Sequence, residues 1–367
     1  MLAPSRNTIA VDARMIGASG IGTCIAELLP RLIAAKPELE FVLLGSRRVL
    51  AVLPWTRAPN ARVIEFNAPI YSIREQIALL RWVPKRTDIL WSPHYNSPVA
   101  WRGRLVVTIH DLAHLALPEF VGGPHRRAYA RFMFDRVSRS ADAIMTDSEF
   151  TRAEFVRLVG VRRAEPQVVH LGVDREWFEI PRSPSPHPRP YLLYVGNVKP
   201  HKNLGRLLQA FEQLASGISC DLLILGKNEG FLSEDGGGRA AAERLAPRVQ
   251  LLGALPQDLL KRYVSHAEAV VQPSLYEGFG LPPLEAMAAG CPTIVSRTAS
   301  LPEVCGDAAL YFDPLDPGSI AEAVLRLLRQ PELRATLRCR GLERARHFTW
   351  DRSAEAALTV LERVLAG

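Results

Sequence analysis

Two glutamates frame a glycine-rich segment, Glu277-Gly278-Phe279-Gly280-Leu281-Pro282-Pro283-Leu284-Glu285. Proline is tolerated in the first turn of a helix, where backbone N–H groups lack partners, so a helix is predicted to start at Pro282 or Pro283 and to end before Gly290. The amides of residues 278–281 then approach a helix N-terminus, which favours an anion. Two carboxylates beside such a site suit a ligand that carries both hydroxyl groups and phosphate, such as a nucleotide sugar.

Other residues that could do chemistry come directly after apolar, strand-like runs. They are Gly20 and Gly22 after residues 8–12, His110 after residues 105–109, and Asn197, Lys199 and Lys202 after residues 191–196. Ligands of parallel sheets bind outside the carboxyl ends of the strands, so a position just after a strand raises the functional interest of each residue. A lone histidine is more often structural, and Lys202 alone could be a surface cation.

The elements that must position these residues form two series of buried strands alternating with helices. The strands of the first series are expected at 8–12, 41–45, 62–66, 89–91, 105–109, 143–146 and 167–170, and those of the second at 191–196, 222–226, 249–253, 269–273, 293–296 and 309–312. Helices are expected at 23–35, 256–265, 317–328 and 350–365. Near-continuous apolar runs suit strands covered on both faces, so the fold class is α/β with doubly wound parallel sheets.

A segment of repeated proline and serine, residues 180–190, has no core-forming character and predicts a domain boundary. The first domain is predicted to span residues 1–182, with a C-terminal helix (349–367) packing back on it, and the second to span residues 188–345. Residues 234–239, with three glycines, are expected to form a loop tip.

Several classes of protein are disfavoured. Gly17, Gly20 and Gly22 do not match the spacing of a dinucleotide-binding loop, and no acid closes the second strand, which argues against an oxidoreductase. No D-x-D triplet occurs, so no divalent metal site and no cofactor are expected. The five cysteines are far apart in the sequence and are expected to be buried, reduced thiols.

Composition sets broader limits. The chain has 367 residues, a net charge of +7 and 48% hydrophobic residues, which describes a globular protein of two domains. The first seven residues lack the apolar core of a signal peptide, and no apolar run reaches the roughly 18 residues of a membrane span, so a cytoplasmic location is expected. The positive charge suits phosphate-bearing ligands or an anionic membrane, and no nucleic-acid-binding motif is present.

Two basic segments, residues 74–86 and 121–142, have alternative interpretations. Both could be solvated helices with no further role. The first also carries Ile77, Leu79, Leu80 and Trp82 among its basic residues, and a basic surface with apolar side chains is typical of peripheral contact with anionic lipid at the inner face of the plasma membrane.

Six segments together resemble the retaining glycosyltransferases of glycosyltransferase family 4, which have the GT-B fold of two Rossmann-like domains facing a central cleft. They are Gly20-Ile21-Gly22, Thr108-Ile109-His110-Asp111-Leu112, Asp147-Ser148-Glu149-Phe150-Thr151-Arg152, residues 195–204, residues 277–285 and Ser300-Leu301-Pro302-Glu303-Val304. The spacing of the two glutamates around G-F-G-L-P is the most diagnostic of these. Within the family, the sequence is similar to bacterial mannosyltransferases of polysaccharide and O-antigen assembly that use GDP-mannose.

The resemblance implies a role for each candidate. Glu277 binds hydroxyl groups of the transferred hexose, Glu285 binds the ribose, and Lys202 neutralises the leaving phosphate. His110 lies near the hexose at the reaction centre, where it is expected to hydrogen-bond to the sugar or the acceptor. Amides at Gly20, Gly22 and residues 278–281 face the phosphates. Many relatives carry arginine where this chain has Asn197, so Lys199 or an arginine of the first domain could supply the missing charge.

The implied reaction moves mannose from GDP-mannose to a glycan acceptor, expected to be linked to a polyprenyl lipid, with retention of configuration and without a metal. Alternatives are a UDP-hexose donor, a nucleotide-sugar epimerase, and a non-catalytic protein that binds nucleotides or glycans. The pairing of Glu277 with Glu285 disfavours the epimerase. Side chains near residues 252–256 do not identify the base.

Overall fold

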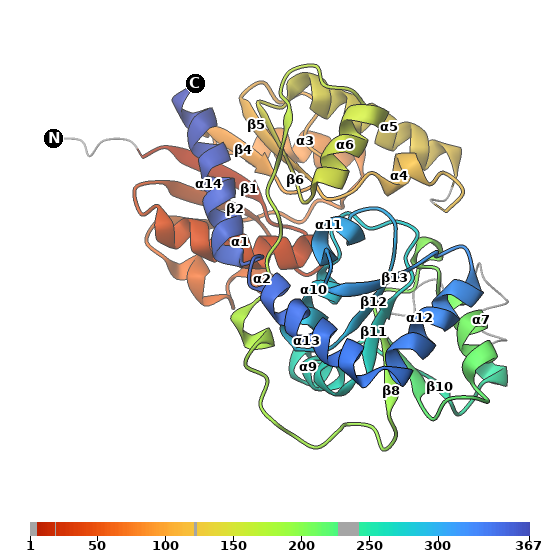
Figure 1. Ribbon diagram of the computed structural model, residues 1–367. Coiled ribbons are helices and arrows are strands. Elements are labelled where there is room, and N and C mark those ends of the chain that lie inside the picture. Colours follow the sequence, from red (N-terminus) through yellow and green to blue (C-terminus); the bar gives the residue numbers. More distant parts are fainter. Residues whose placement is uncertain (1–5, 19, 121–122, 227–241) are drawn as a thin grey trace. The chain divides into compact units, whose positions relative to one another are not determined.

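The structure, a computed structural model, describes residues 6–18, 20–120, 123–226 and 242–367. Contacts between Cα atoms divide the chain into two compact units: a first unit, Met1–Gly172 with Trp350–Gly367, and a second unit, Val173–Thr349. The loop expected at residues 234–239 lies outside the described residues. Each unit is an α/β domain built on one parallel sheet (Figure 1).

The first unit contains a seven-stranded sheet in the order β3-β2-β1-β4-β5-β6-β7, with every pair of neighbours parallel. The strands are β1 (Thr8–Asp12), β2 (Glu40–Gly45), β3 (Ala61–Glu65), β4 (Ile89–Ser92), β5 (Arg104–Ile109), β6 (Ala143–Thr146) and β7 (Pro166–Val168). The chain winds outward from β1 to β3 and then returns to place β4 on the other side of β1. The carboxyl ends of β1 and β4 therefore form a topological switch point, where ligands of this architecture bind.

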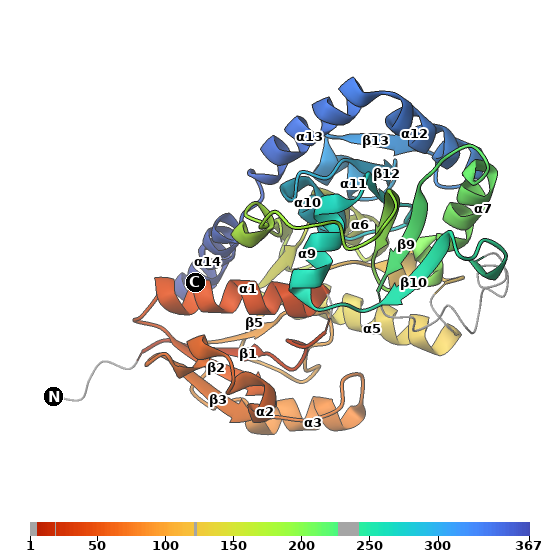
Figure 2. The same cartoon turned by 90° about the horizontal axis from the view of Figure 1, so that it is seen from below.

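Helices cover both faces of this sheet. On one face, α1 (Gly20–Ala35) packs beside the C-terminal α14 (Trp350–Ala366), as Figures 1 and 2 both show. Alternate strand residues such as Ala10, Val42 and Leu90 point to the opposite face and share a core cluster with side chains of the other helices. Those helices are α3 (Ile73–Trp82), α4 (Ala113–Ala116), α5 (Pro124–Ser140) and α6 (Glu149–Leu158). The short α2 (Arg47–Leu50) and η1 (Pro54–Arg57) complete the unit.

The second unit contains a six-stranded parallel sheet in the order β10-β9-β8-β11-β12-β13. Its strands are β8 (Tyr191–Val195), β9 (Asp221–Leu225), β10 (Val249–Gly253), β11 (Ala269–Gln272), β12 (Thr293–Ser296) and β13 (Ala309–Phe312). Here the order reverses between β8 and β11, so the loops after these two strands meet at the switch point.

Helices also cover both faces of the second sheet. Side chains of α7 (Leu204–Leu214) and α12 (Pro317–Arg329) join a core cluster with Leu192 and Tyr194 of β8. Tyr191, which points to the other face, packs on Tyr263 of α9 (Gln257–His266). The remaining elements are α10 (Leu281–Ala288), α11 (Leu301–Cys305), α13 (Pro331–Ala345), η2 (Arg175–Trp177) and η3 (Pro200–Lys202).

The predicted α/β class and the two doubly wound parallel sheets are confirmed. Helix α1 begins at Gly20, three residues before the predicted start, because Gly22 allows the helix to begin against the preceding loop. A Cβ atom at Gly22 would lie 2.6 Å from the carbonyl oxygen of Ile16 and 2.8 Å from that of Met15. Gly22 therefore has a packing role that its place in a glycine-rich motif does not reveal.

The contacts group residues 173–182 with the second unit, whereas the sequence predicted them in the first. The N–H of Val173 donates to the carbonyl of Phe348 at 3.0 Å. The proline-serine segment also packs on the second unit, because His266 Nε2 lies 2.7 Å from the Ser183 carbonyl oxygen. These hydrogen bonds involve backbone groups, which the composition of the segment could not predict.

Two further observations bear on the expectations from sequence. Within the described ranges, no helix is long and apolar enough to cross a membrane. All five cysteines are free thiols, and Cys24, Cys220, Cys291 and Cys305 are buried as expected. Cys339 contradicts the expectation, because it lies on the exposed side of α13.

Candidate functional site

The carboxylate of Glu277 lies at the centre of a hydrogen-bonded cluster in the loop after β11. The Lys202 ammonium donates to both carboxylate oxygens at 2.8 Å. Ser274 Oγ and Gln272 Nε2 donate to Oε1 at 2.7 and 2.8 Å. The side chain of Glu277 is only 10% exposed. Gln272 and Ser274 were not singled out from the sequence, although both directly precede the glycine-rich segment.

Lys202 reaches Glu277 because the loop after β8 is fastened to the loop after β11. The side-chain amide of Asn203 donates to the carbonyls of Pro273 at 2.9 Å and Pro314 at 2.7 Å. The N–H of Leu275 donates to the carbonyl of His201 at 2.8 Å. Asn203 has a positive φ of 61°, which asparagine tolerates better than most residues. This residue, also not singled out from the sequence, sets where Lys202 can lie.

The surroundings of Glu277 favour its ionised form. Burial by itself raises the pKa of this carboxyl, but the charge and hydrogen bond of Lys202 and the hydrogen bond from Ser274 outweigh it, so the pKa is lowered. A buried carboxylate with a cationic partner and two neutral donors is ionised and has a defined orientation. It can accept hydrogen bonds from the hydroxyl groups of a ligand.

The segment between the two glutamates turns into α10 through Gly280, whose φ is 112°. This backbone conformation favours glycine, and a Cβ atom there would also lie 2.8 Å from Leu301 Cδ2 and would require that side chain to move. Ser300 Oγ donates to the carbonyls of Glu277 and Phe279 at 2.9 and 2.7 Å, which holds the loop in shape. The Phe279 ring is buried against Phe348, so its backbone and not its ring is the part suited to a ligand.

Glu285, in the first turns of α10, has a different environment. Burial raises the pKa of Glu285 to about 8, and the charge of Lys261 opposes this only in part. Lys261 itself pairs with Glu176. Within the described residues, the Glu285 carboxylate has no hydrogen bond or ion pair. It is therefore the poorly solvated acid of the two, and donors from a ligand would favour its ionised form.

The remaining candidates of the second unit lie in the loop after β8. The Tyr194 hydroxyl donates to the carbonyl of Asn197 at 3.3 Å, and Lys199 is exposed directly before η3. The structure thus brings Glu277, Lys202 and residues 278–281 together at the switch point, with Asn197 and Lys199 on the loop that carries Lys202. Their binding roles stay predictions.

His110, Gly20 and Gly22 belong to the first unit. His110 directly succeeds β5, and its ring is 13% exposed. Nδ1 lies 2.7 Å from the Asp147 carboxylate, and Nε2 lies 2.8 Å from the carbonyl oxygen of Pro93. A carboxylate and a carbonyl only accept hydrogen bonds, so satisfying both requires a proton on each ring nitrogen. The geometry therefore favours the imidazolium form.

The electrostatics of this pair agree with its geometry. Burial is the largest influence and lowers the pKa of His110, but the charge and hydrogen bond of Asp147, the Pro93 carbonyl and the charge of Asp111 together raise it. Another titratable group at this place is the buried Cys24 thiol on α1, whose pKa is raised well above its usual value by burial and by Asp147. A protonated His110 cannot act as a general base.

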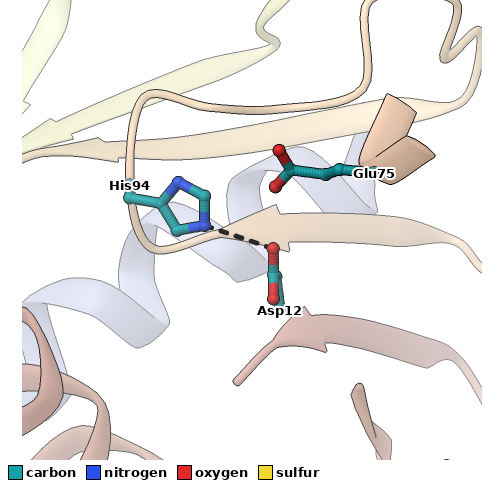
Figure 3. A group of neighbouring side chains, drawn as sticks. All are labelled: Asp12, Glu75 and His94. Atoms are coloured by element: carbon teal, nitrogen blue, oxygen red, sulfur yellow. Dashed lines mark hydrogen bonds and ion pairs between the residues drawn. The ribbon is translucent and has the colours of Figure 1, made fainter. Parts of the chain in front are cut away.

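A second buried polar cluster lies beside the switch point of the first unit. His94 Nε2 is 3.2 Å from the Asp12 carboxylate, and Figure 3 shows the Glu75 carboxylate pointing toward this pair. The ligand atoms of the three residues lie within 4.8 Å of one another, a spacing that a metal ion could use. However, Arg14 Nη2 contacts Asp12 and Glu75 at 2.5 Å each, so a guanidinium already supplies a cation there. The prediction of a metal-free protein stays a prediction.

Substitution of Glu285 by glutamine tests the raised pKa. Because the folded-state pKa lies above the ordinary 4.5, the stabilising contribution of this group is full below about pH 4.5 and is lost as the pH rises through about 8. We expect Glu285→Gln and wild type to melt together near pH 5 and the variant to melt about 3 °C or more higher near pH 8.5. Differential scanning calorimetry measures this.

Glu332→Gln, at an exposed position of α13, is the matched control and should show no pH-dependent difference. A constant gap between Glu285→Gln and wild type across the pH range would show that Glu285 ionises normally.

Substitution of Asp147 by asparagine tests the charged state of His110. In wild type near pH 7.5, NMR of ¹⁵N-histidine-labelled protein should show protons on both ring nitrogens. In Asp147→Asn, the charge and charge-assisted hydrogen bond that chiefly oppose burial are lost, so the pKa of His110 falls and the ring becomes neutral. The stabilising contribution of the pair is present below the ordinary histidine pKa and is lost as the pH rises through the raised one.

Asp135→Asn, which removes an exposed partner of Arg139 in the same unit, is the control and should leave the His110 signals unchanged. His110→Gln assigns the signals. A ring nitrogen without a proton in wild type at neutral pH would contradict the imidazolium form.

Comparisons with known proteins agree with this architecture. The family described as Glycosyltransferase Family 4 matches residues 18–177, and the family described as Glycosyl transferases group 1 matches residues 175–344. O-antigen chain mannosyltransferase B of Escherichia coli is 31% identical over 91% of this chain and 93% of its own length. A GDP-mannose-dependent alpha-(1-6)-phosphatidylinositol dimannoside mannosyltransferase of Mycobacterium tuberculosis is 30% identical over 71% of this chain and 69% of its own.

Among solved structures, sucrose-phosphate synthase from Thermosynechococcus elongatus superimposes with a TM-score of 0.81 at 21% identity. The superposition covers 98% of this chain and 100% of the other, which shows a shared fold. The two parallel-sheet Rossmann-like domains are those of the GT-B fold. Together with the match to the Escherichia coli enzyme over nearly the whole chain, these findings establish that this protein belongs to glycosyltransferase family 4 and is a glycosyltransferase.

Proposed function

We propose that this glycosyltransferase transfers mannose from GDP-mannose to a glycan acceptor carried by a polyprenyl lipid, during assembly of a bacterial surface polysaccharide. The observation that carries the proposal is the ion pair of Lys202 and Glu277 at the switch point of the second unit, beside the N-terminus of α10. The pair combines an ammonium group, which is suited to phosphate, with an ionised carboxylate, which is suited to hydroxyl groups. The names of the Escherichia coli and Mycobacterium tuberculosis relatives support the choice of mannose and of GDP-mannose.

Each residue takes a role that fits its environment. Glu277 accepts hydrogen bonds from the hexose hydroxyl groups, since its carboxylate is ionised and oriented. Lys202 and the amides of residues 278–281 bind the diphosphate. Glu285 accepts hydrogen bonds from the ribose hydroxyls, which would offset the poor solvation that raises its pKa. Lys199 and Asn197 contribute to the phosphate site from the loop after β8.

The reaction breaks the bond between the sugar anomeric carbon and the diphosphate oxygen and forms a bond to an acceptor oxygen. Because the diphosphate is a good leaving group, the protein mainly stabilises the charge that develops on it. In a front-face mechanism the acceptor proton passes to the leaving phosphate oxygen, and the configuration is retained without a protein base. This agrees with His110, whose two ring nitrogens are occupied and which would contribute a positive charge.

A UDP-hexose donor is the main alternative, since neither Glu277 nor Lys202 reads the base. A non-catalytic protein that binds nucleotides or glycans is the alternative from another class. A thermal-shift series with GDP, UDP and ADP separates the donors, and GDP is expected to give the largest rise in Tm. Hydrolysis or transfer of the sugar separates an enzyme from a binding protein.

Removal of either charge of the central pair should abolish most activity. We expect Glu277→Gln and Lys202→Met each to lower kcat for GDP-mannose hydrolysis by about 100-fold or more, a loss typical of residues that stabilise the transition state electrostatically. Released GDP is measured in a coupled assay, and Tm confirms folding.

Lys36→Met is the matched control, because it breaks an ion pair with Glu362 in the first unit and should keep wild-type kcat. Near wild-type turnover in folded Glu277→Gln would refute the catalytic role, and a wild-type protein that neither binds nor turns over any nucleotide sugar would refute the enzyme.

A surface of α3 supports contact with the membrane that would hold the acceptor. Ile77, Leu80 and Trp82 are 60%, 40% and 54% exposed, whereas Leu79 is buried. Four exposed basic residues surround them: Arg74, Arg81, Lys85 and Arg86. Apolar side chains interleaved with positive charge suit the interface of an anionic bilayer, so we place the enzyme at the inner face of the plasma membrane.

The other basic segment has a more structural character. Its helix α5 uses Arg136 to bind the Val99 carbonyl and Arg139 to pair with Asp135. Arg131 donates to the Leu158 carbonyl at 2.6 Å. Arg131 and Arg136 thus bind backbone carbonyls of other segments, and Arg139 pairs within its own helix, so α3 is the better candidate for the membrane surface. Residues 121–122 of this segment lie outside the described ranges.

Sedimentation with vesicles tests the α3 surface. Wild type should pellet with vesicles that contain anionic phosphatidylglycerol and not with pure phosphatidylcholine, because each basic side chain contributes about 1 kcal/mol near an anionic surface. The double variant Ile77→Ser/Trp82→Ser should stay largely in the supernatant.

Leu315→Ser, at a position 62% exposed in the second unit, is the control and should sediment like wild type. A wild-type protein that does not bind anionic vesicles at low salt, or a double variant that binds as well as wild type, would refute the surface.

A further inference from the structure

Tyr71, which lies just before α3 in the first unit, combines two uncommon features. Its φ is 64°, in the left-handed region that a bulky residue seldom adopts, and its side chain is 48% exposed. Residues in such conformations persist only where their surroundings impose them, and they concentrate at functional sites. Neither the packing of the core nor the roles proposed above use Tyr71.

A buried carboxylate imposes this conformation. Glu75, which is fully buried, accepts a hydrogen bond from the Tyr71 N–H at 2.8 Å. The same carboxylate binds Arg14 Nη2 at 2.5 Å and the side-chain amide of Asn96. Arg14 in turn binds Asp12, at the end of β1. The backbone of Tyr71 is thus held by a network that reaches from α3 to the switch point, the cluster drawn in part in Figure 3.

Aromatic rings support the exposed side chain. The Tyr71 ring lies 5.9 Å from that of Tyr95 and 6.2 Å from that of Tyr129, the latter edge to face at 86°. Tyr129 donates its hydroxyl hydrogen bond to Asn96, and Tyr95 stacks on Phe134 with centroids 4.6 Å apart. The network that fixes the backbone of Tyr71 therefore also fixes the rings beneath its side chain.

This aromatic group adjoins the end of β5. The Tyr95 ring lies 5.9 Å from the ring of His114 on α4, three residues after Asp111. Burial, and to a smaller extent the charges of Asp111 and Glu75, raise the pKa of Tyr71. Asp111 is the residue directly after His110 in the sequence. Tyr71 thus lies at the carboxyl edge of the first unit's sheet, the edge at which His110 follows β5.

We propose that Tyr71 is the sugar-stacking platform of the acceptor site, holding a neutral hexose ring of the acceptor against its exposed face. The inference rests on the proposed function, since it assumes transfer to a glycan. A partly exposed aromatic ring presents a negative π face to the C–H groups of a sugar. The hydroxyl groups of Tyr71 and Tyr95 and the carboxylate of Asp111 offer polar partners to the sugar hydroxyls, as recognition sites combine apolar area with a few placed polar groups.

The polar groups beside the Tyr71 ring also discriminate a glycan from other ligands. A polyprenyl chain has no groups that hydrogen-bond to a hydroxyl or a carboxylate, and covering the Tyr71 hydroxyl or the Asp111 carboxylate with hydrocarbon is unfavourable. A nucleoside diphosphate would bring negative charge toward Asp111 and Glu75. A neutral sugar can pack its C–H groups on the aromatic face and hydrogen-bond to the polar groups beside it.

Tyr71→Gly is the decisive variant, because glycine adopts a positive φ without strain and the change removes the ring without disturbing the backbone. The assay uses the full-length enzyme with GDP-mannose as donor and with methyl α-mannoside or α-linked mannobioses as acceptor probes. KM for the acceptor should rise about tenfold or more. The rate of GDP-mannose hydrolysis without acceptor and KM for the donor should stay within twofold. Tyr71→Phe, which keeps the ring, should rescue most of the affinity.

Val52→Ala is the control, because this apolar residue is 71% exposed in the loop between α2 and η1 of the same unit and has no part in any proposed site, so the acceptor KM should stay at the wild-type value. An unchanged acceptor KM in Tyr71→Gly, or a changed donor KM, would overturn the platform while leaving the proposed function intact.

A binding experiment tests the Tyr71 platform even if the enzyme turns over no donor and the proposed function is wrong. Saturation-transfer NMR with the same sugar probes should show contact with wild type and Tyr71→Phe and loss of contact with Tyr71→Gly. Equal signals for all variants, or none for wild type with any probe, would also overturn it.

Discussion

Burial of ionised carboxylates at the carboxyl edges of the two sheets is the constraint on which the rest of the site depends. A carboxylate removed from water is strongly destabilised unless a cation and hydrogen-bond donors replace its hydration. Glu277 meets this requirement through Lys202, Ser274 and Gln272. The requirement explains why the loop after β8 is fastened to the loop after β11 by Asn203, since a free loop could not keep the lysine in place.

The first unit meets the same constraint with different residues. Arg14 lies between Asp12 and Glu75, and His110 pairs with Asp147. In each case the cation lies just after a strand end. The charge that keeps the acid ionised therefore also fixes the positions of the side chains at the carboxyl edge of the sheet. Arg14 thus occupies the place where a metal ion could otherwise balance the charges of Asp12 and Glu75.

Glu285 is a half-buried acid for which the constraint is not met. Its carboxylate has no such partner in the described part of the chain, and its pKa is raised to about 8 by burial. Glu277 and Glu285 are eight residues apart and chemically identical, yet one is ionised and oriented and the other is poorly solvated. Glu277 is therefore suited to bind a ligand while it is already ionised. Glu285 is suited to ionise when hydrogen-bond donors of the ligand bind to it.

Local sequence determined much of this protein. Apolar runs located the strands, and Pro282 and Gly290 delimited α10 to within two residues, because these features depend on short-range backbone preferences. The spacing of Glu277 and Glu285 around the glycines indicated the family, because motif spacing is itself a property of the sequence. The hydrogen bond from the Glu75 N–H to Ser72 Oγ at the start of α3 is likewise local, whereas the contact between Glu75 and Arg14 is not.

Only the tertiary structure decided which charges pair. Lys202 and Glu277 are 75 residues apart, and His110 and Asp147 are 37 apart, and each meets its partner because the winding order of the sheet brings their strand ends together. The positive φ of Tyr71 likewise arises from Glu75 and from a network that spans β1, α3 and the loop after β4. Burial and long-range pairing set the pKa values of Glu285 and His110. Their protonation states therefore could not be predicted from residue type alone.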